Sequence, residues 1–126
     1  AAYISYIFSE RQGYSKFGSY VGNGNANGAF IYTGFKPAFI MVKKANNTGG
    51  WQLRDNKRTT FNLLTNLLYA NSTSAEQTTD GIDFLSNGWK LRNSAGDNNA
   101  SGDTYIFMAF AENPFVSSTG VPATTR

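Results

Sequence analysis

The sequence predicts an all-β protein, an antiparallel β-sandwich of the jelly-roll or lectin-like kind with short strands and Asn/Gly turns. Aromatic residues, mostly Phe and Tyr, make up 15% of the 126 residues, and these side chains favour strands. The 13 glycines and the many asparagines supply the residues that tight turns require. Only 15% of the residues are charged, so the polar surface must come largely from Asn, Ser, Thr and Gly.

The composition also excludes several kinds of function. The chain has no Cys and no His, which excludes thiol nucleophiles, disulfides, zinc sites and His-based triads. The net charge of +3 is small and scattered, whereas nucleic-acid binding needs a clustered basic face. No apolar run approaches the roughly 20 residues that span a bilayer, so we expect no membrane insertion. No carboxylate spacing identifies a glycosidase pair, and we expect neither enzymatic activity nor a cofactor.

The first half of the chain alternates between short strands and turns. Strands are predicted at residues 3–10, 14–21, 29–32, 38–43 and 51–54. The connection at 22–28 reads GNGNANG, and nearly all of its residues tolerate positive φ. The hydrophobic segment 38–43 is predicted to be a central strand, joined through a turn at 46–50 to the strand that follows. Period two in that strand places Trp51 and Leu53 on one face.

The second half contains the weakest and the strongest local signals. Residues 55–79 favour an irregular segment or short strands, with a polar surface loop at 71–79. Asn87-Gly88 is the dipeptide that type I′ hairpin turns require, so strands are predicted on both sides of it. This turn would place Ser86 opposite Trp89 and Asp83 opposite Arg92. The face predicted to point toward the core contains Ile82, Phe84, Trp89 and Leu91.

The last predicted strand, at 104–112, has a near copy at the start of the chain. Segments 3–10 and 105–112 share Tyr, Ile, Phe and Glu at four of eight aligned positions, 102 residues apart. Similarity at a domain-sized spacing indicates tandem modules, although two buried aromatic-rich strands of one sheet would also look alike. The predicted organisation is a closing strand of a preceding module or an N-terminal strand at 1–12, a β-sandwich module at 13–116, and an extended polar tail at 117–126.

Polar side chains in three predicted loops, 22–28, 46–50 and 93–103, are the candidate binding residues. They are Asn23, Asn25, Asn27, Asn46, Asn47, Asp97, Asn98 and Asn99. The stretch 97–103 loosely resembles a calcium loop because hard cations prefer carboxylate and amide oxygens. It lacks the closing Glu of an EF-hand, so we interpret it as a solvated loop and predict no metal site. Trp51 and Trp89 could stack on sugars, but both fall on the apolar side of hairpins and are interpreted as core residues.

Several motifs resemble a module of virion proteins from marine tailed bacteriophages, of the tail-fibre or fibre-like type. They are GYSKFGSYVGNG at 13–24, YTGFKPAF at 32–39, DNKR at 55–58, DFLSNG at 83–88, and ASG at 100–102 with the segment 105–115. In such proteins the module is repeated in tandem, and a strand ending in Phe-x-Glu directly precedes the Gly-Tyr-Ser-Lys-Phe-Gly motif. Phe8-Ser9-Glu10 precedes Gly13 in the same way. Ala29 departs from the pattern, which has Pro before Phe30.

The resemblance implies a virion structural protein, assembled in the host bacterial cytoplasm and exposed on the particle surface. We expect a tail-fibre or receptor-binding module, a homotrimer that contacts other virion subunits and binds a host cell-surface glycan or protein through its loops. One alternative is a capsid decoration, head-fibre or tail-assembly protein that binds only virion subunits, by strand addition through 3–10 or 117–126. Another is a free lectin-like carbohydrate-binding module. Exposed aromatics at the loops would favour receptor binding, and apolar contacts between chains would favour the structural role.

Overall fold

The computed structural model describes residues 1–121 and confirms the all-β antiparallel fold. These residues contain no helix, and so none that is long and apolar enough to cross a membrane. The eight strands are β1 (Ser15–Val21), β2 (Phe30–Tyr32), β3 (Pro37–Lys44), β4 (Trp51–Asp55), β5 (Leu64–Tyr69), β6 (Gln77–Leu85), β7 (Gly88–Leu91) and β8 (Thr104–Ala111).

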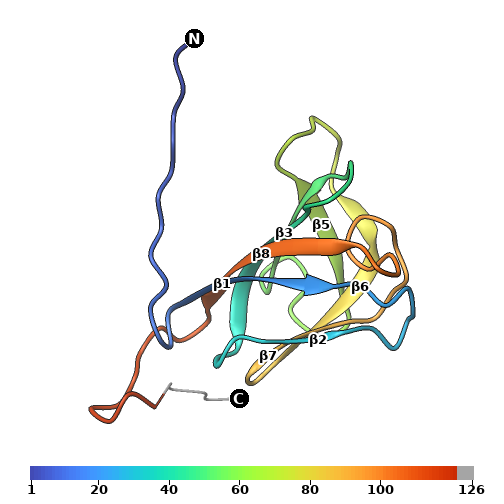
Figure 1. The fold of residues 1–126 in the computed structure, drawn as a ribbon. Helices are drawn as coiled ribbons and strands as arrows, with labels where there is room; N and C mark the ends of the chain where they lie inside the picture. Colours follow the sequence, from blue (N-terminus) through green and yellow to red (C-terminus); the bar gives the residue numbers. More distant parts are fainter. Residues whose placement is uncertain (122–126) are drawn as a thin grey trace.

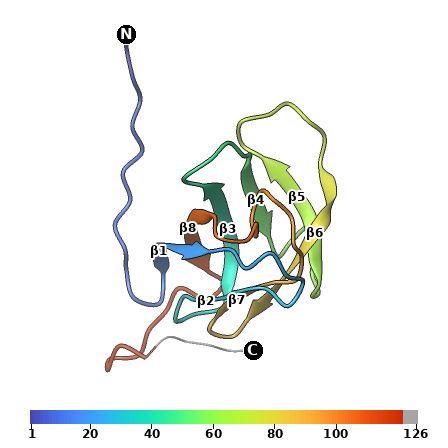
Figure 2. The same ribbon diagram turned by 45° about the vertical axis from the view of Figure 1, so that its right-hand side comes forward.

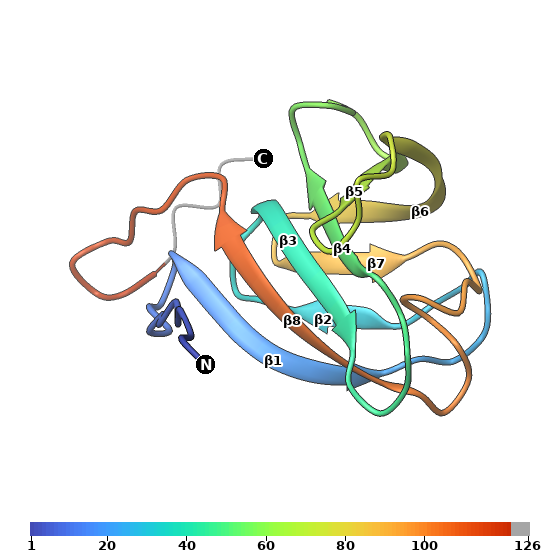
Figure 3. The ribbon, with the colours of Figure 1, turned by 90° about the horizontal axis from the view of Figure 1, so that it is seen from above.

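The strands form one continuous sheet in the order β1-β8-β3-β4-β5-β6-β7-β2. All neighbouring strands in it are antiparallel. The sheet curls into a nearly closed, barrel-like arrangement, so that β1, β8, β3 and β4 face β6, β7 and β2 across the interior (Figures 1 and 3). The edge strands are β1 and β2. The predicted central strand is confirmed, because β3 lies between β8 and β4.

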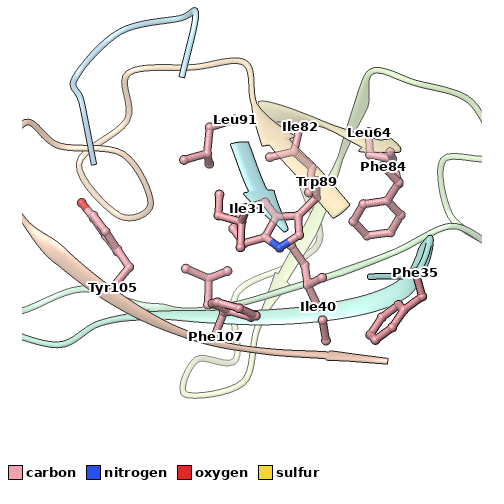
Figure 4. Packing of buried hydrophobic residues seen from close by; sticks show 12 residues of the cluster. Ile31, Phe35, Ile40, Leu64, Ile82, Phe84, Trp89, Leu91, Tyr105 and Phe107 are labelled. Atoms are coloured by element: carbon pink, nitrogen blue, oxygen red, sulfur yellow. The ribbon is translucent and has the colours of Figure 1, made fainter. Parts of the chain in front are cut away.

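The core fills the space between the two halves of the sheet. Trp89 is fully buried at its centre, where Ile31, Ile40 and Phe107 surround it (Figure 4). The rings of Tyr20 and Phe107 meet the indole edge-on, at centroid distances of 5.3 and 6.1 Å. Such edge-to-face pairs add roughly 0.5–1.5 kcal/mol each to the burial of apolar area. The interpretation of Trp89 as a core residue is therefore confirmed.

The hairpin of β6 and β7 forms as predicted but in a different register. Leu85 lies opposite Gly88, and Phe84 lies opposite Trp89, so the turn consists of Ser86 and Asn87 rather than Asn87 and Gly88. Gly88 is needed in the strand, because a Cβ there would lie 2.1 Å from the carbonyl oxygen of Ile31 on β2. The shift keeps the face assignment, and the side chains predicted to point inward are buried: Ile82, Phe84, Trp89 and Leu91.

The interpretation of Trp51 as a core residue is wrong. On β4 the polar side chains Gln52 and Arg54 point inward and are almost fully buried, whereas Trp51 is 37% exposed on the outer surface. Arg54 donates to the carbonyl oxygens of Leu64 and Thr79 at 3.3 and 3.4 Å, where the register between β5 and β6 is irregular. Buried carbonyl oxygens need hydrogen-bond donors, and Arg54 supplies them from inside the barrel. Because Arg54 points inward, Trp51 points outward, although the apolar pattern of the strand predicts the reverse.

Two further predictions are corrected in part. The segment 55–79 contains the short strand β5, as one of the two expected alternatives, but β6 begins at Gln77, inside the predicted polar loop 71–79. Thr78 is held in that strand because it lies opposite Asn66. At the other end, residues 117–121 form a turn rather than an extended tail, with Gly120 N donating to Ser117 O at 2.9 Å. Residues 122–126 of the predicted tail lie outside the described residues.

The predicted first strand does not form. Residues 1–10, called the arm below, pair with no strand of the sheet, and the N-terminal part of the arm stands clear of the body in two views (Figures 1 and 2). The position that their sequence resembles, between β1 and β3, is occupied by β8 of the same chain. The arm therefore has no equivalent place in its own sheet.

Candidate functional site

The predicted binding loops meet at one end of the barrel, called the loop end below. In the first loop, the side chains of Asn23 and Asn25 accept hydrogen bonds from the backbone N–H groups of Asn25 and Asn27, at 3.0 and 2.8 Å. The Asn23 side chain also donates to Asn27 O at 3.0 Å. These bonds are the Asx-turn contacts that make asparagine common in tight loops. The three asparagines are exposed, but the groups named here already hold their own loop together.

Asn98 and Asn99 were predicted to lie in an exposed loop, and the structure buries both. Asn99 is a hub: its Oδ1 accepts from Asn23 N, and its Nδ2 lies 2.6 Å from Asn93 O and 2.9 Å from Asn25 O. Asn98 donates to Gln52 inside the barrel at 3.1 Å. Buried polar groups need such partners, and these two side chains close the barrel out of reach of solvent. Asn98 Oδ1 is the exception, since it is buried without a hydrogen-bond partner.

The remaining predicted site residues are Asn46, Asn47 and Asp97. Asn46 binds the start of β8: its Oδ1 accepts from Thr104 N at 3.1 Å. Asn47 accepts from the next backbone N–H, that of Thr48. Asp97 is half-buried and accepts from the hydroxyl of Tyr69 at 3.2 Å. Within residues 1–121, no three acidic side chains gather closely enough to hold a metal ion.

An apolar groove lies elsewhere, on the outer surface of β1, β8, β3 and β4. Its volume is about 410 Å³. We call it the outer groove; it is lined by Phe17, Gly18, Met41, Lys43, Trp51, Ile106, Phe107 and Met108. Two rows of side chains that run across the strands build it. In one row Lys43 lies between Ile106 and Trp51, and in the other Met108 lies between Phe17 and Met41.

Lys43 does not make the outer groove polar. Its Nζ turns back to donate to the carbonyl oxygen of Lys44 at 2.5 Å, which leaves the aliphatic stem along the groove. Trp51 and Ile106 are 37% and 44% exposed at its margins. A groove with so few polar groups does not suit a sugar, whose hydroxyls need hydrogen-bond partners, but it suits an apolar segment of protein.

The arm is a second apolar surface that the rest of the chain leaves exposed to solvent. Its side chains Tyr3, Ile4, Tyr6 and Ile7 are 82–90% exposed, and Phe8 is 55% exposed. Its base is fixed: Glu10 forms an ion pair with Lys16 at 2.8 Å and accepts from Phe17 N at 3.3 Å. The hydrogen bond from Lys16 and that from the Phe17 backbone lower the pKa of Glu10.

Sequence reasoning identified the arm but missed the outer groove. The signal for the groove was that several strands have large apolar residues on both faces. Phe17, Met41, Ile106 and Met108 point away from the core, whereas other apolar members of their strands pack in it. A strand with one solvated face normally alternates apolar and polar residues, so two apolar faces indicate a covered outer surface. Three of the nine exposed aromatic side chains among the described residues lie on the arm, and the others are spread over the body: Tyr14, Phe30, Tyr32, Trp51, Phe61 and Phe115.

Residues 1–114 match a domain family described as a domain of unknown function (DUF7483). The match includes both the arm and the whole barrel. No curated protein and no solved structure matches the chain.

Proposed function

The chain belongs to the DUF7483 family, and we propose that it is a structural module of a bacteriophage virion that joins neighbouring virion subunits through its arm. The phage assignment rests on the resemblance of the motifs at 13–24 and 32–39 to tail-fibre-like modules. The joining role is carried by one observation, the five large apolar side chains that the arm holds in solvent. Exposed apolar surface of this kind marks a site of association.

The size of the arm is sufficient for this role. At the typical areas of aromatic and aliphatic side chains, its exposed apolar surface is on the order of 600 Å². A standard protein interface buries about 800 Å² per partner. Burial of this area is worth roughly 15 kcal/mol before losses. Association costs about 4–15 kcal/mol in lost freedom, so the arm can support a stable contact when each copy contributes one.

The arm resembles β8, and this likeness identifies the kind of partner. Because β8 already lies between β1 and β3 in the same chain, the arm is a strand-like segment whose cover comes from another body. A second subunit or a neighbouring module of the same fold would both provide it. We propose a homotrimer, in which each arm contacts an adjacent copy.

Receptor binding at the loop end stays a prediction. The asparagines there make hydrogen bonds within and between their own loops, which leaves fewer of their polar groups for a ligand. These observations favour the structural role, in which the protein binds only other virion subunits. Multivalent display by a trimer would still allow weak contacts of the loops with a host surface.

Light scattering of the purified chain tests the proposal. We expect a trimer for the full chain and a monomer for a variant with Ile4→Ser, Tyr6→Ser and Ile7→Ser. These three side chains are at least 82% exposed, so their replacement leaves the barrel intact. A chain that starts at Gly13 should also be monomeric. A full chain that is monomeric at all concentrations, or an oligomer that survives the triple substitution, would contradict the proposed function.

A further inference from the structure

The outer groove is continuous with the place where the arm leaves the body. Phe8 packs against Phe17 and Phe110 on the outer surface, at ring-centroid distances of 6.2 and 5.9 Å. Phe17 also lines the outer groove. The base of the arm therefore covers one corner of the outer face of its own copy. The residues of the arm before Phe8 lead away from that copy (Figure 1).

The dimensions of the outer groove match those of the arm. The groove crosses four adjacent strands, β1, β8, β3 and β4, which at about 4.8 Å per strand spans roughly 14 Å. An extended chain rises about 3.3 Å per residue, so the segment from Tyr3 to Ile7 spans roughly 13 Å. Both surfaces are apolar, and the one cation in the groove, Lys43, is bonded to a backbone carbonyl. The arm segment from Tyr3 to Ile7 has no charged side chain, and it can lie over the aliphatic stem of Lys43 while the ammonium keeps its hydrogen bond to the carbonyl oxygen of Lys44.

We propose that the arm segment from Tyr3 to Ile7 lies in the outer groove of a second copy of this chain. The inference rests on the proposed function and adds the surface that receives the arm. It also explains why Trp51 faces outward: the indole forms one wall of the site that the neighbouring arm occupies. In this arrangement the arm contacts two copies. Phe8 packs against its own copy, and the segment from Tyr3 to Ile7 packs against the neighbouring copy.

Tryptophan fluorescence tests this arrangement directly, because the chain has two tryptophans in different settings. Trp51 lines the groove and is 37% exposed, whereas Trp89 is fully buried in the core. Acrylamide quenching of the full chain should therefore report on Trp51. We expect quenching to fall by at least twofold as the concentration rises through the association range. Quenching that does not change while the mass increases would overturn the inference.

Substitution in the outer groove supplies the second test. Ile106→Glu places a carboxylate opposite Lys43 and Ser19, so the monomer tolerates it, while the groove becomes acidic. We expect at least tenfold weaker association. Phe61→Glu is the matched control, since Phe61 is 81% exposed and lines neither the outer groove nor the hollow at the base of the arm, and it should leave association unchanged. Met108→Gln is a second groove variant, which adds a polar group without a charge. Circular dichroism checks the fold of each variant.

The outcomes separate the two proposals. If the triple arm substitution abolishes association and both groove substitutions leave it unchanged, the proposed function stands and the groove is not the acceptor. If the groove substitutions weaken association and the control does not, the inference is supported. If association requires neither the arm nor the groove, both proposals are wrong.

Discussion

Replacing Asn99 by aspartate exchanges the amide Nδ2 for an oxygen and leaves the size of the side chain unchanged. In the native protein this Nδ2 lies 2.6–3.1 Å from three oxygens: the carbonyls of Asn93 and Asn25, and Oδ1 of Asn23. Asn99→Asp therefore removes the donors and directs a carboxyl oxygen at three acceptors. The bond that Asn99 Oδ1 accepts from Asn23 N can persist.

The loss of stability expected for Asn99→Asp follows from the burial of the side chain. A typical hydrogen bond contributes about 1 kcal/mol net, and a buried acceptor left without a partner costs about 1–3 kcal/mol more. Asn99 is fully buried, so solvent does not replace the lost bonds. We expect Asn99→Asp to lower the free energy of unfolding by roughly 3–5 kcal/mol. Burial also raises the pKa of the new carboxyl, so the loss should shrink at low pH, where the protonated acid can donate once.

Urea unfolding followed by tryptophan fluorescence measures this loss. With a slope of about 1–3 kcal/mol per molar urea, the midpoint should fall by roughly 1–3 M. Asn47→Asp is the matched control: it makes the same chemical change on an exposed side chain and keeps the bond from Thr48 N. We expect less than about 0.5 kcal/mol for the control. A loss below 1 kcal/mol for Asn99→Asp would refute the assignment of Asn99 as a structural hub.

Two further predictions concern buried groups. Arg54→Ala removes a buried guanidinium that donates to two backbone carbonyls, and we expect it to lower the free energy of unfolding by about 3–5 kcal/mol. Arg92→Ala, on a half-exposed side chain, should cost less than about 1 kcal/mol in the same urea unfolding experiment, and equal losses would contradict this account. Burial raises the pKa of Tyr20 and of Tyr105, so both phenols stay neutral in the folded protein where unfolded tyrosine ionises. The stability from these two groups is complete below pH 10 and is lost as the pH rises above it. Burial also raises the pKa of Tyr69, and the hydrogen bond to Asp103 raises the pKa of Lys44, so four groups act in this direction. Burial lowers the pKa of Arg54 to about 10, which acts in the opposite direction over the same range, as one group against four. Urea midpoints between pH 9 and 11 should therefore fall, and Tyr20→Phe should reduce the slope; a flat profile would contradict the prediction.

Local sequence signals predicted the class of the fold and most of its strands. The hydrophobic run at 38–43 becomes the central strand β3, and the segments on both sides of Asn87-Gly88 become β6 and β7. These features depend on propensity, on periodicity and on turn residues, all of which act over a few neighbouring positions. The register of the β6–β7 hairpin could not be predicted in the same way, because the close approach of Gly88 to Ile31 involves a strand far away in the sequence.

The side chains of the candidate site also depend on contacts between residues that are far apart in the sequence. An asparagine in a polar loop reads the same in the sequence whether it faces solvent or closes the barrel, and the contacts of Asn99 with three other loop residues decide which of the two applies. The outward direction of Trp51 likewise depends on Arg54, whose donors serve carbonyls of β5 and β6.

The sequence by itself determined an all-β chain, the approximate positions of most of its strands, and an apolar first segment that resembles the last strand. Only the tertiary structure decided that this segment has no place in its own sheet, because β8 fills the position between β1 and β3. It also decided which apolar residues line the outer groove, since the direction of a side chain in a curled sheet depends on register with distant strands. A pattern along the chain specifies that two faces are apolar, and only the assembled sheet specifies which face is inside.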